Sequence, residues 1–318
     1  MKKIIIFTAF IVCFIACNNS QEQPATNAKN KNSAVPSPQK AKIKTVGILL
    51  YDGYAVLDAM GPYHVLSELM GVNVFFVGRH KGIVTTANEM KVQCDTSIAE
   101  VKQLDILVIP GGLNDTYKAT KDTALLNWVR AIDATSTFTT SVCTGAWILG
   151  AAGLLKDREA TTHWYGKKML ASEFGAKVVN KRFVKSGKYW TSAGVTAGMD
   201  MSLGLINEIK GEQYTKTVML DLEYDPQPPF PGGSEQKTDP TIVAGLRKMY
   251  DDGLGTALHP EKAFTNINFE NKKDYICGMP LTAGVADTAN YQGKIYGFCS
   301  SGCKDEFKKN PESYLTLK

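Results

Sequence analysis

The chain has 318 residues and a formal net charge of +5 at pH 7; 44% of its residues are hydrophobic and 21% are charged. This length allows one domain of ordinary size with additional segments, and the composition is that of a globular protein rather than a disordered or fibrous one. The net charge is small, and the sequence contains no dense basic stripe with interleaved aromatic residues. We therefore expect no nucleic-acid partner.

The N-terminus has the pattern of a bacterial export signal. Two lysines precede an apolar run at residues 4–15, which is too short to span a bilayer comfortably. The run ends at Phe14-Ile-Ala-Cys17, which resembles a lipoprotein cleavage box. We predict a signal peptide at 1–17, lipidation of Cys17, and a membrane-anchored lipoprotein of the cell envelope, on the periplasmic side or the surface. A plain secretory signal or an uncleaved anchor is the alternative.

Residues 18–42 are rich in Asn, Gln, Ser, Pro and Lys, which predicts a flexible tether. The cysteines of the chain do not indicate a disulfide framework, although disulfides are common in exported proteins. Cys13 would leave with the signal peptide, Cys17 would carry lipid, and three cysteines form a separate C-terminal group. The two that remain, Cys94 and Cys143, are not expected to pair.

From residue 43 onward, short apolar runs alternate with longer amphipathic runs. Strands are predicted at 44–50, 74–77, 106–109 and 138–142, and helices within 55–70 and at 124–132 and 146–155. The alternation continues at 170–174, 176–179, 189–192 and 198–209, and one more helix is predicted at 240–251. The helix within 55–70 is expected to begin at Gly61-Pro62. This alternation predicts an α/β fold with a mostly parallel sheet and helices on both faces.

Three loop segments follow predicted strands: residues 52–62, Pro110-Gly-Gly112 and Cys143-Thr144. In open parallel sheets, sites form beyond the carboxyl ends of the strands, so these segments predict a functional site. Cys143 lies where a strand ends and a helix begins. Such a corner exposes the sulfur near unpaired backbone N–H groups, which favour the thiolate. A buried, inert cysteine is the alternative.

Four separated segments of the chain form a recognisable set: Ser141-Val-Cys-Thr-Gly-Ala, Ala151-Ala-Gly-Leu-Leu, Ala160-Thr-Thr-His-Trp164 and Thr191-Ser-Ala-Gly-Val-Thr-Ala-Gly-Met-Asp200. In this order they resemble the DJ-1/PfpI superfamily, and Leu57-Asp-Ala-Met-Gly-Pro62 and Tyr224-Asp-Pro-Gln-Pro-Pro-Phe230 fit as well. The most similar branch contains isonitrile hydratase and the sensor halves of certain AraC-type regulators. The resemblance covers about residues 43–250 and implies a flavodoxin-like three-layer sandwich with a nucleophile elbow, within a domain at 43–255 that usually forms a homodimer.

The same resemblance implies the roles of individual residues. Cys143 would be the nucleophile, and Asp58 would be its carboxyl partner, which shuttles a proton to the substrate. Backbone N–H groups of Gly112 and Thr144 would form an anion hole, and His163 would lie near the nucleophile. No cofactor is expected in this domain. Alternatively, Asp58 caps a helix, the glycines form a tight turn, and His163 is a packed structural residue.

The implied activity is isonitrile hydratase-like conversion of an isonitrile to an N-substituted formamide, or a related hydrolase or lyase reaction on a small molecule. Fold alone does not determine the reaction. The alternative is a non-catalytic envelope lipoprotein that binds or transports metal or senses oxidants. A regulator role is not expected, because related regulators carry a C-terminal helix-turn-helix whereas this C-terminal part contains cysteines and β-like segments.

The C-terminal part contains the segments Asp274-Tyr-Ile-Cys-Gly-Met-Pro280, Tyr291-Gln-Gly-Lys-Ile-Tyr-Gly-Phe-Cys-Ser-Ser-Gly-Cys303 and Phe307-Lys-Lys-Asn-Pro-Glu-Ser-Tyr-Leu315. These segments closely resemble a YHS domain; the resemblance covers about residues 271–317, and we place the domain at 268–318. Such modules occur on copper-transporting ATPases. A module this short rarely buries enough apolar surface to be stable alone, and a bound metal ion can stabilise it. We therefore expect Cys277, Cys299 and Cys303 to bind a copper or zinc ion. Met279 would be a fourth ligand or a core residue. A disulfide, or three packed thiols, is the alternative.

Overall fold

The four central strands of the main sheet, β1 (Thr45–Leu50), β6 (Ile106–Ile109), β7 (Phe138–Val142) and β11 (Tyr189–Ser192), are almost completely buried, whereas the strands toward its edges are partly exposed. The computed structural model describes residues 42–258, 264, 267–281 and 284–315. The predicted signal peptide, the tether except its last residue, and the lipidation site Cys17 lie outside the described residues.

The main sheet has seven strands in the order β10-β11-β7-β6-β1-β2-β5. These are β1 (Thr45–Leu50), β2 (Asn73–Gly78), β5 (Thr96–Ser97), β6 (Ile106–Ile109), β7 (Phe138–Val142), β10 (Phe183–Ser186) and β11 (Tyr189–Ser192). All neighbouring pairs are parallel except β10 and β11. The mostly parallel α/β fold predicted from the sequence is therefore confirmed.

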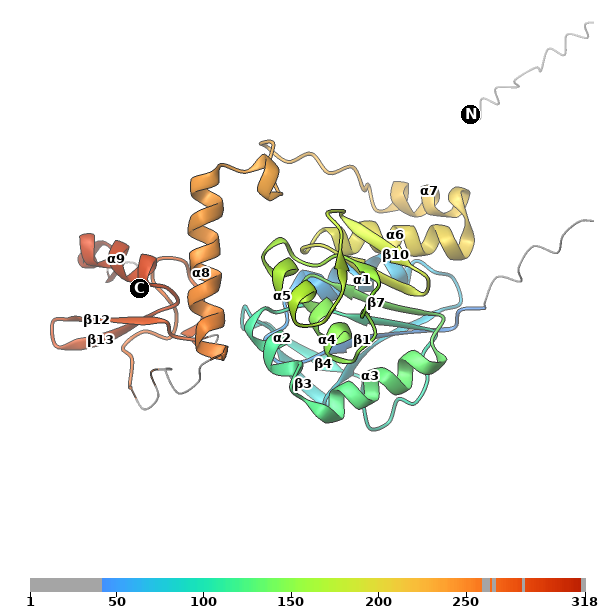
Figure 1. Ribbon diagram of the computed structural model, residues 1–318, viewed down its shortest axis with the longest axis horizontal. Helices are drawn as coiled ribbons and strands as arrows, with labels where there is room; N and C mark the ends of the chain where they lie inside the picture. Colours follow the sequence, from blue (N-terminus) through green and yellow to red (C-terminus); the bar gives the residue numbers. More distant parts are fainter. Residues whose placement is uncertain (1–41, 259–263, 265–266, 282–283, 316–318) are drawn as a thin grey trace, which may run out of the picture. The chain divides into compact units, whose positions relative to one another are not determined.

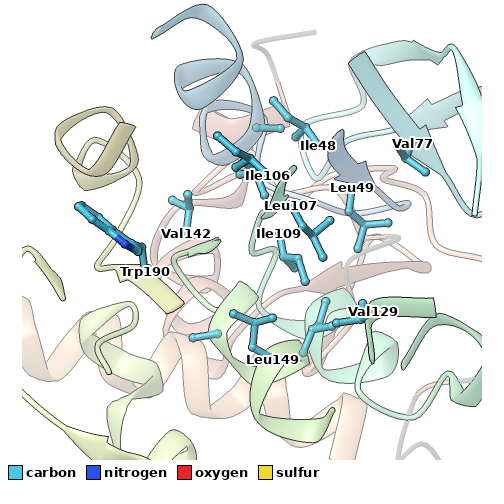
Figure 2. Close-up of a cluster of buried hydrophobic side chains, with 14 of the residues drawn as sticks. Ile48, Leu49, Val77, Ile106, Leu107, Ile109, Val129, Val142, Leu149 and Trp190 are labelled. Atoms are coloured by element: carbon cyan, nitrogen blue, oxygen red, sulfur yellow. The ribbon is translucent and has the colours of Figure 1, made fainter. Parts of the chain in front are cut away.

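Helices cover both faces of this sheet. The helices of this part of the chain are α1 (Val56–Ser67), α2 (Asn114–Ala119), α3 (Thr123–Thr135), α4 (Gly145–Ala151), α5 (Lys167–Ser172), α6 (Ala197–Lys210) and α7 (Glu212–Asp221), of which α7 packs on α6. Helix α1 packs against α6, whereas α4 packs against α2 and α3, and Figure 1 shows the sheet between these two groups. In Figure 2, Leu149 and Val129 from the α3–α4 layer lie beside Leu107 and Ile109 of β6. Burial on both faces explains why β1 and β6 read as continuous apolar runs.

Two features differ from the sequence-based expectation. Helix α1 begins at Val56, before Pro62 rather than at it, so that the proline lies inside the helix. The antiparallel hairpin of β3 (Gly82–Thr85) and β4 (Lys91–Cys94) was not predicted, nor was β8 (Glu159–Ala160), which pairs with β9 (Lys177–Val178). Strands this short carry too few residues for a clear alternation of apolar and polar positions.

The C-terminal part begins with the long helix α8 (Pro240–Leu258). One short 3₁₀ helix, η2 (Glu235–Lys237), precedes α8, and another, η1 (Trp164–Gly166), precedes α5. The C-terminal part continues with the hairpin β12 (Asp287–Tyr291) and β13 (Lys294–Phe298), and with α9 (Ser301–Lys309) and α10 (Pro311–Leu315). Its small core includes Tyr296, Phe298 and Phe307. Among the described helices, none combines the length and the apolar character needed to cross a membrane.

The approach of α4 to β6 requires a residue without a side chain at position 145. A Cβ on Gly145 would lie 2.2 Å from the Ile109 carbonyl oxygen, a backbone atom that cannot move aside. We expect Gly145→Ala to lower the free energy of unfolding by about 3 kcal/mol in chemical denaturation. Gly245→Ala, in open space on α8, is the matched control and should leave stability unchanged or raise it by up to about 1 kcal/mol. Equal effects of the two variants would contradict this account.

Candidate active site

Cys143 lies at the corner between β7 and α4 with a positive φ of 58°. This conformation is uncommon for a residue with a side chain and stores strain. Three backbone interactions hold it: the Cys143 N–H donates to the Ser192 and Ala193 carbonyls at 3.2 and 3.1 Å, and the Cys143 carbonyl accepts from the Thr162 hydroxyl at 2.6 Å. The predicted strand-to-helix elbow is therefore present.

The loop that follows β6, at Gly111 and Gly112, is in close contact with this elbow and with its neighbouring loops. A Cβ on Gly111 would lie 2.6 Å from the Thr144 backbone nitrogen and 3.0 Å from Asp58 Oδ2. A Cβ on Gly112 would lie 2.3 Å from the Gly53 carbonyl oxygen. Parallel pairing of β1, β6 and β7 carries the three loops to the same edge of the sheet. The glycines are thus required for close approach, and not only for a turn.

The Asp58 carboxyl is buried in the first turn of α1, against the elbow. Its Oδ2 accepts from the Gly111 N–H at 3.1 Å, and the carboxyl interacts with the Cys143 thiol. Oδ1 has no conventional hydrogen-bond partner among the described residues. Helix α1 has Ala55 at its N-cap position and no side-chain cap. The alternative of Asp58 as a helix cap is therefore wrong.

Burial sets the proton affinity of this pair. Desolvation raises the pKa of Asp58 to about 7, against the lowering effect of hydrogen bonds from Cys143 and Gly111. Desolvation, followed by the charge of Asp58, raises the pKa of Cys143, while hydrogen bonds from the Thr144 N–H and hydroxyl lower it. The expected net stabilisation of the thiolate by the helix N-terminus is therefore outweighed by burial. Near neutral pH, a proton is available to pass between sulfur and carboxyl oxygen.

Thr144 occupies the position where the anion hole was expected. Its hydroxyl oxygen accepts from the backbone N–H groups of Gly112 at 3.1 Å and Leu113 at 3.2 Å. The Gly112 N–H is therefore engaged in this arrangement, and it becomes available to an anion only if the Thr144 side chain rotates. The Thr144 N–H, in contrast, is directed at the Cys143 sulfur.

A chain of hydroxyl groups behind Thr144 was not predicted. The Tyr51 hydroxyl donates to the Pro110 carbonyl at 2.8 Å and lies 2.8 Å from the Thr116 hydroxyl, which lies 3.1 Å from that of Thr144. Since each hydroxyl carries one hydrogen and Tyr51 uses its own on Pro110, Thr116 donates to Tyr51. The single hydrogen of the Thr144 hydroxyl can then be donated either to Thr116 or to the Cys143 sulfur. Tyr51 directly follows β1, and Thr116 lies in α2, beyond the end of β6. Tyrosine and threonine are too common at such positions for the sequence to mark these two residues.

The cysteine opens into a cavity of about 340 Å³. Its lining includes Cys143, Thr144, Gly112 and His163, together with residues of α8 and of the segment 277–280. Cys143 retains 8% of its surface, whereas Cys94 is fully buried and does not line this cavity. Cys143 is thus buried, as the alternative interpretation expected, but it lines the cavity, whereas Cys94 is enclosed in the core.

His163 lies at the same cavity but carries no positive charge at neutral pH. Burial, with a smaller contribution from the charge of Lys167, lowers the pKa of His163 to about 4. Its ring is edge-on to that of Tyr250, with centroids 5.6 Å apart. The imidazole can therefore donate or accept a hydrogen bond in the cavity, and it cannot stabilise a thiolate by charge.

A second cluster lies in the C-terminal part. The ligand atoms of Asp274, Cys277, Cys299 and Cys303 all lie within 4.8 Å of one another. The Cys299 sulfur is 3.3 Å from that of Cys277 and 3.8 Å from that of Cys303. Zinc–sulfur bonds of about 2.3 Å place tetrahedral sulfur ligands about 3.8 Å apart, so small shifts would accommodate an ion.

Asp274 was not predicted as a member of this cluster. It is fully buried, and its two oxygens accept from the Ile276 and Cys299 N–H groups, each at 2.9 Å. Each oxygen retains a lone pair that could face an ion. Met279, the fourth ligand considered from the sequence, packs against the module's apolar cluster. Its place in the core agrees with the second interpretation given for it.

Comparison with known proteins adds the following similarities. The sequence model of the DJ-1/PfpI family matches residues 44–208 of this chain, and the sequence model of the YHS domain matches residues 272–318. Isonitrile hydratase of Pseudomonas putida is 37% identical over 224 residues, which cover 70% of this chain and 97% of that enzyme. The HTH-type transcriptional regulator CdhR of Pseudomonas aeruginosa is 30% identical over 174 residues, which cover 52% of this chain and 50% of the regulator.

A solved structure of similar architecture is a THiJ/PfpI family protein from Pseudomonas syringae. It has a TM-score of 0.65 and 31% sequence identity, and the match covers 71% of this chain and 97% of that one.

The raised pKa of Asp58 predicts a specific dependence of stability on pH. The folded state holds this proton to about pH 7, whereas an unfolded chain releases it near pH 4. Folding is therefore favoured at low pH by this group, and the contribution is lost as pH rises through 7. Between pH 5 and 8, the free energy of unfolding should fall by up to about 3 kcal/mol more in the wild type than in Asp58→Asn.

Urea denaturation at several pH values measures this difference. Asp221→Asn, at an exposed position at the end of α7, is the control and should keep the wild-type dependence. Parallel pH profiles for the wild type and Asp58→Asn would show that the carboxyl is ionised in the folded protein.

Proposed function

Because the chain belongs to the DJ-1/PfpI family and carries a YHS domain, we propose that it is a cysteine-dependent enzyme that hydrates isonitriles to N-substituted formamides. The observation that supports this most directly is the juxtaposition of Cys143 and the protonatable Asp58 at a cavity for a small molecule. The similarity to isonitrile hydratase favours this reaction over others known for the fold.

The first half of the proposed reaction forms a thioimidate. The Cys143 proton passes to the Asp58 carboxylate, and the sulfur attacks the terminal carbon of the isonitrile. Asp58 then returns the proton to that carbon, so that sulfur and hydrogen are both bonded to it. The Thr144 N–H and hydroxyl, which favour the anionic sulfur, lower the barrier to the attack.

The second half uses one water. The Asp58 carboxylate removes a proton from the water while the water oxygen adds to the thioimidate carbon. Asp58 then passes that proton to the substrate nitrogen. The carbon–sulfur bond then breaks with its electron pair returning to Cys143, and the hydroxyl proton leaves the new carbonyl oxygen for the sulfur through Asp58. The product is the formamide, and the enzyme regains its starting protonation state.

This proposal predicts that activity depends on two side chains. Formation of formamide from cyclohexyl isocyanide, measured by mass spectrometry, should fall by at least about 1000-fold in Cys143→Ser and in Asp58→Asn. Cys94→Ala removes the other thiol of the domain, which lies outside the cavity, and should retain activity. Equal formamide production by the wild type and Cys143→Ser would exclude the hydratase mechanism.

We further propose that the C-terminal module binds one Cu(I) or Zn(II) ion through Cys277, Cys299 and Cys303, with Asp274 beside it. The chemistry of the cluster supports this, since thiolates select soft or borderline ions. Metal binding or redox sensing without catalysis by Cys143 is the second candidate function, and the same cluster favours it.

Metal content tests this site. Under reducing, oxygen-free conditions the full chain should bind one equivalent of zinc, and Cys299→Ser should bind at least about 10-fold more weakly, because a central thiolate is lost. Cys94→Ala should bind like the wild type. Substoichiometric binding by the folded wild type, or a Cys277–Cys299 disulfide detected under these conditions, would contradict the proposal.

The export signal and Cys17 support, from the sequence alone, a lipid-anchored location in the cell envelope. We propose that location, and a homodimer of the first domain, as the setting in which a small-molecule substrate reaches Cys143.

A further inference from the structure

The Cys143 cavity is lined both from the range that matches the DJ-1/PfpI family and from the range that matches the YHS domain. Its lining combines Cys143 and Thr144 with the segment Cys277–Pro280 of the YHS domain. Cys277 therefore belongs to both sites: it lines the cavity, and it is one of the four residues of the cluster formed with Asp274, Cys299 and Cys303. Of the three thiols in that cluster, Cys277 is the exposed one.

Helix α8 contacts the regions on both sides of this cavity. Its Met249 and Tyr250 line the cavity, and Met249 packs against the core of the YHS domain. Leu254, one turn later, is buried in the core of the first domain. The Tyr250 ring also packs edge-on against His163.

Polar contacts from consecutive residues of α8 join the same two regions. Asp251 Oδ1 accepts from the Tyr165 hydroxyl at 2.7 Å, on the side of the first domain. Asp252 Oδ2 accepts from the Ser301 N–H and hydroxyl, each at 3.3 Å, at the start of α9. Neighbouring side chains of one helical turn thus connect the nucleophile's domain to the module that carries the thiols.

The segment that lines the cavity is tied to the cluster by short-range hydrogen bonds. The Gly278 N–H donates to the Asp274 carbonyl at 2.8 Å, and the Asp274 N–H donates to the Met279 carbonyl at 2.8 Å. The Asp274 carboxyl accepts in turn from the Cys299 N–H. An ion bound to the Cys277 sulfur would therefore order the side chain and the turn that form this wall of the cavity.

We propose that metal binding at the Asp274–Cys277–Cys299–Cys303 cluster controls access of small molecules to Cys143, because Cys277 and Met279 belong to the wall of the Cys143 cavity. This inference rests on the metal site proposed above and is independent of the hydratase reaction. Since coupling between two binding sites is reciprocal, a molecule that fills the cavity also changes the affinity of the cluster for metal.

Alkylation of Cys143 measures this coupling without turnover. The full chain, reduced and free of oxygen, is treated with iodoacetamide in the absence and presence of zinc, and the rate of modification of the Cys143 peptide is followed by mass spectrometry. We expect full zinc occupancy to slow this rate by about 10-fold, within the range typical of coupled sites. Zinc content is measured in parallel.

Met279→Ala alters the wall without removing a thiol. It should keep the wild-type zinc stoichiometry, while protection of Cys143 falls below about 2-fold. Met219→Ala, at a partly exposed position on α7, is the matched control and should show the wild-type protection. The double variant Cys299→Ser/Cys303→Ser lacks the cluster and should show no protection, which excludes direct binding of zinc to Cys143.

The outcomes separate the two proposals. An unchanged Cys143 rate at full zinc occupancy overturns the coupling and leaves the metal site intact. Failure of the folded protein to bind zinc overturns both. Protection that persists in the double variant also overturns the coupling, because zinc would then act at Cys143 itself.

Discussion

The candidate active site depends on a proton held between two buried groups, the Asp58 carboxyl and the Cys143 thiol. Both groups lose solvation when the domain folds, and both pKa values rise as a result. The protein offsets this cost only in part, with the Gly111 N–H on the carboxyl and Thr144 on the sulfur. A carboxyl that titrates near neutrality is suited to accept and return a proton in one reaction cycle.

The rest of the first domain places these groups. Residues after β1, β6 and β7 meet because the strands are parallel and in register, so that three loops distant in the sequence share one edge. The strained φ of Cys143 persists because surrounding hydrogen bonds over-determine it. The glycines at 111, 112 and 145 are needed because backbone from neighbouring loops occupies the space of a side chain.

The C-terminal region contributes residues to the wall of the Cys143 cavity. The cavity is lined from the range that matches the DJ-1/PfpI family, from the range that matches the YHS domain, and from α8 between them. In this chain, a thiol of a candidate metal site therefore lies on the wall of the cavity of a candidate nucleophile. Helix α8 makes this possible, since its consecutive residues contact both regions.

Local patterns in the sequence were sufficient for the features that depend on near neighbours. Continuous apolar runs predicted β1 and β6, and the β-prone stretch that ends at Cys143 predicted β7 and the elbow. Burial of a strand and a strand-to-helix corner are properties of a few adjacent residues. The spacing of Cys277, Cys299 and Cys303 likewise indicated a common cluster.

Only the tertiary structure decided the proton affinities and the composition of the cavity. Desolvation depends on every atom around a group, so the helix N-terminus that favours a thiolate at Cys143 could not be weighed against burial from the sequence. The engagement of the Gly112 N–H by Thr144, and the presence of Asp274 and Tyr250 at their sites, depend on contacts between distant segments. Residue type alone does not mark such positions, because aspartate, threonine and tyrosine occupy ordinary surface and core positions far more often.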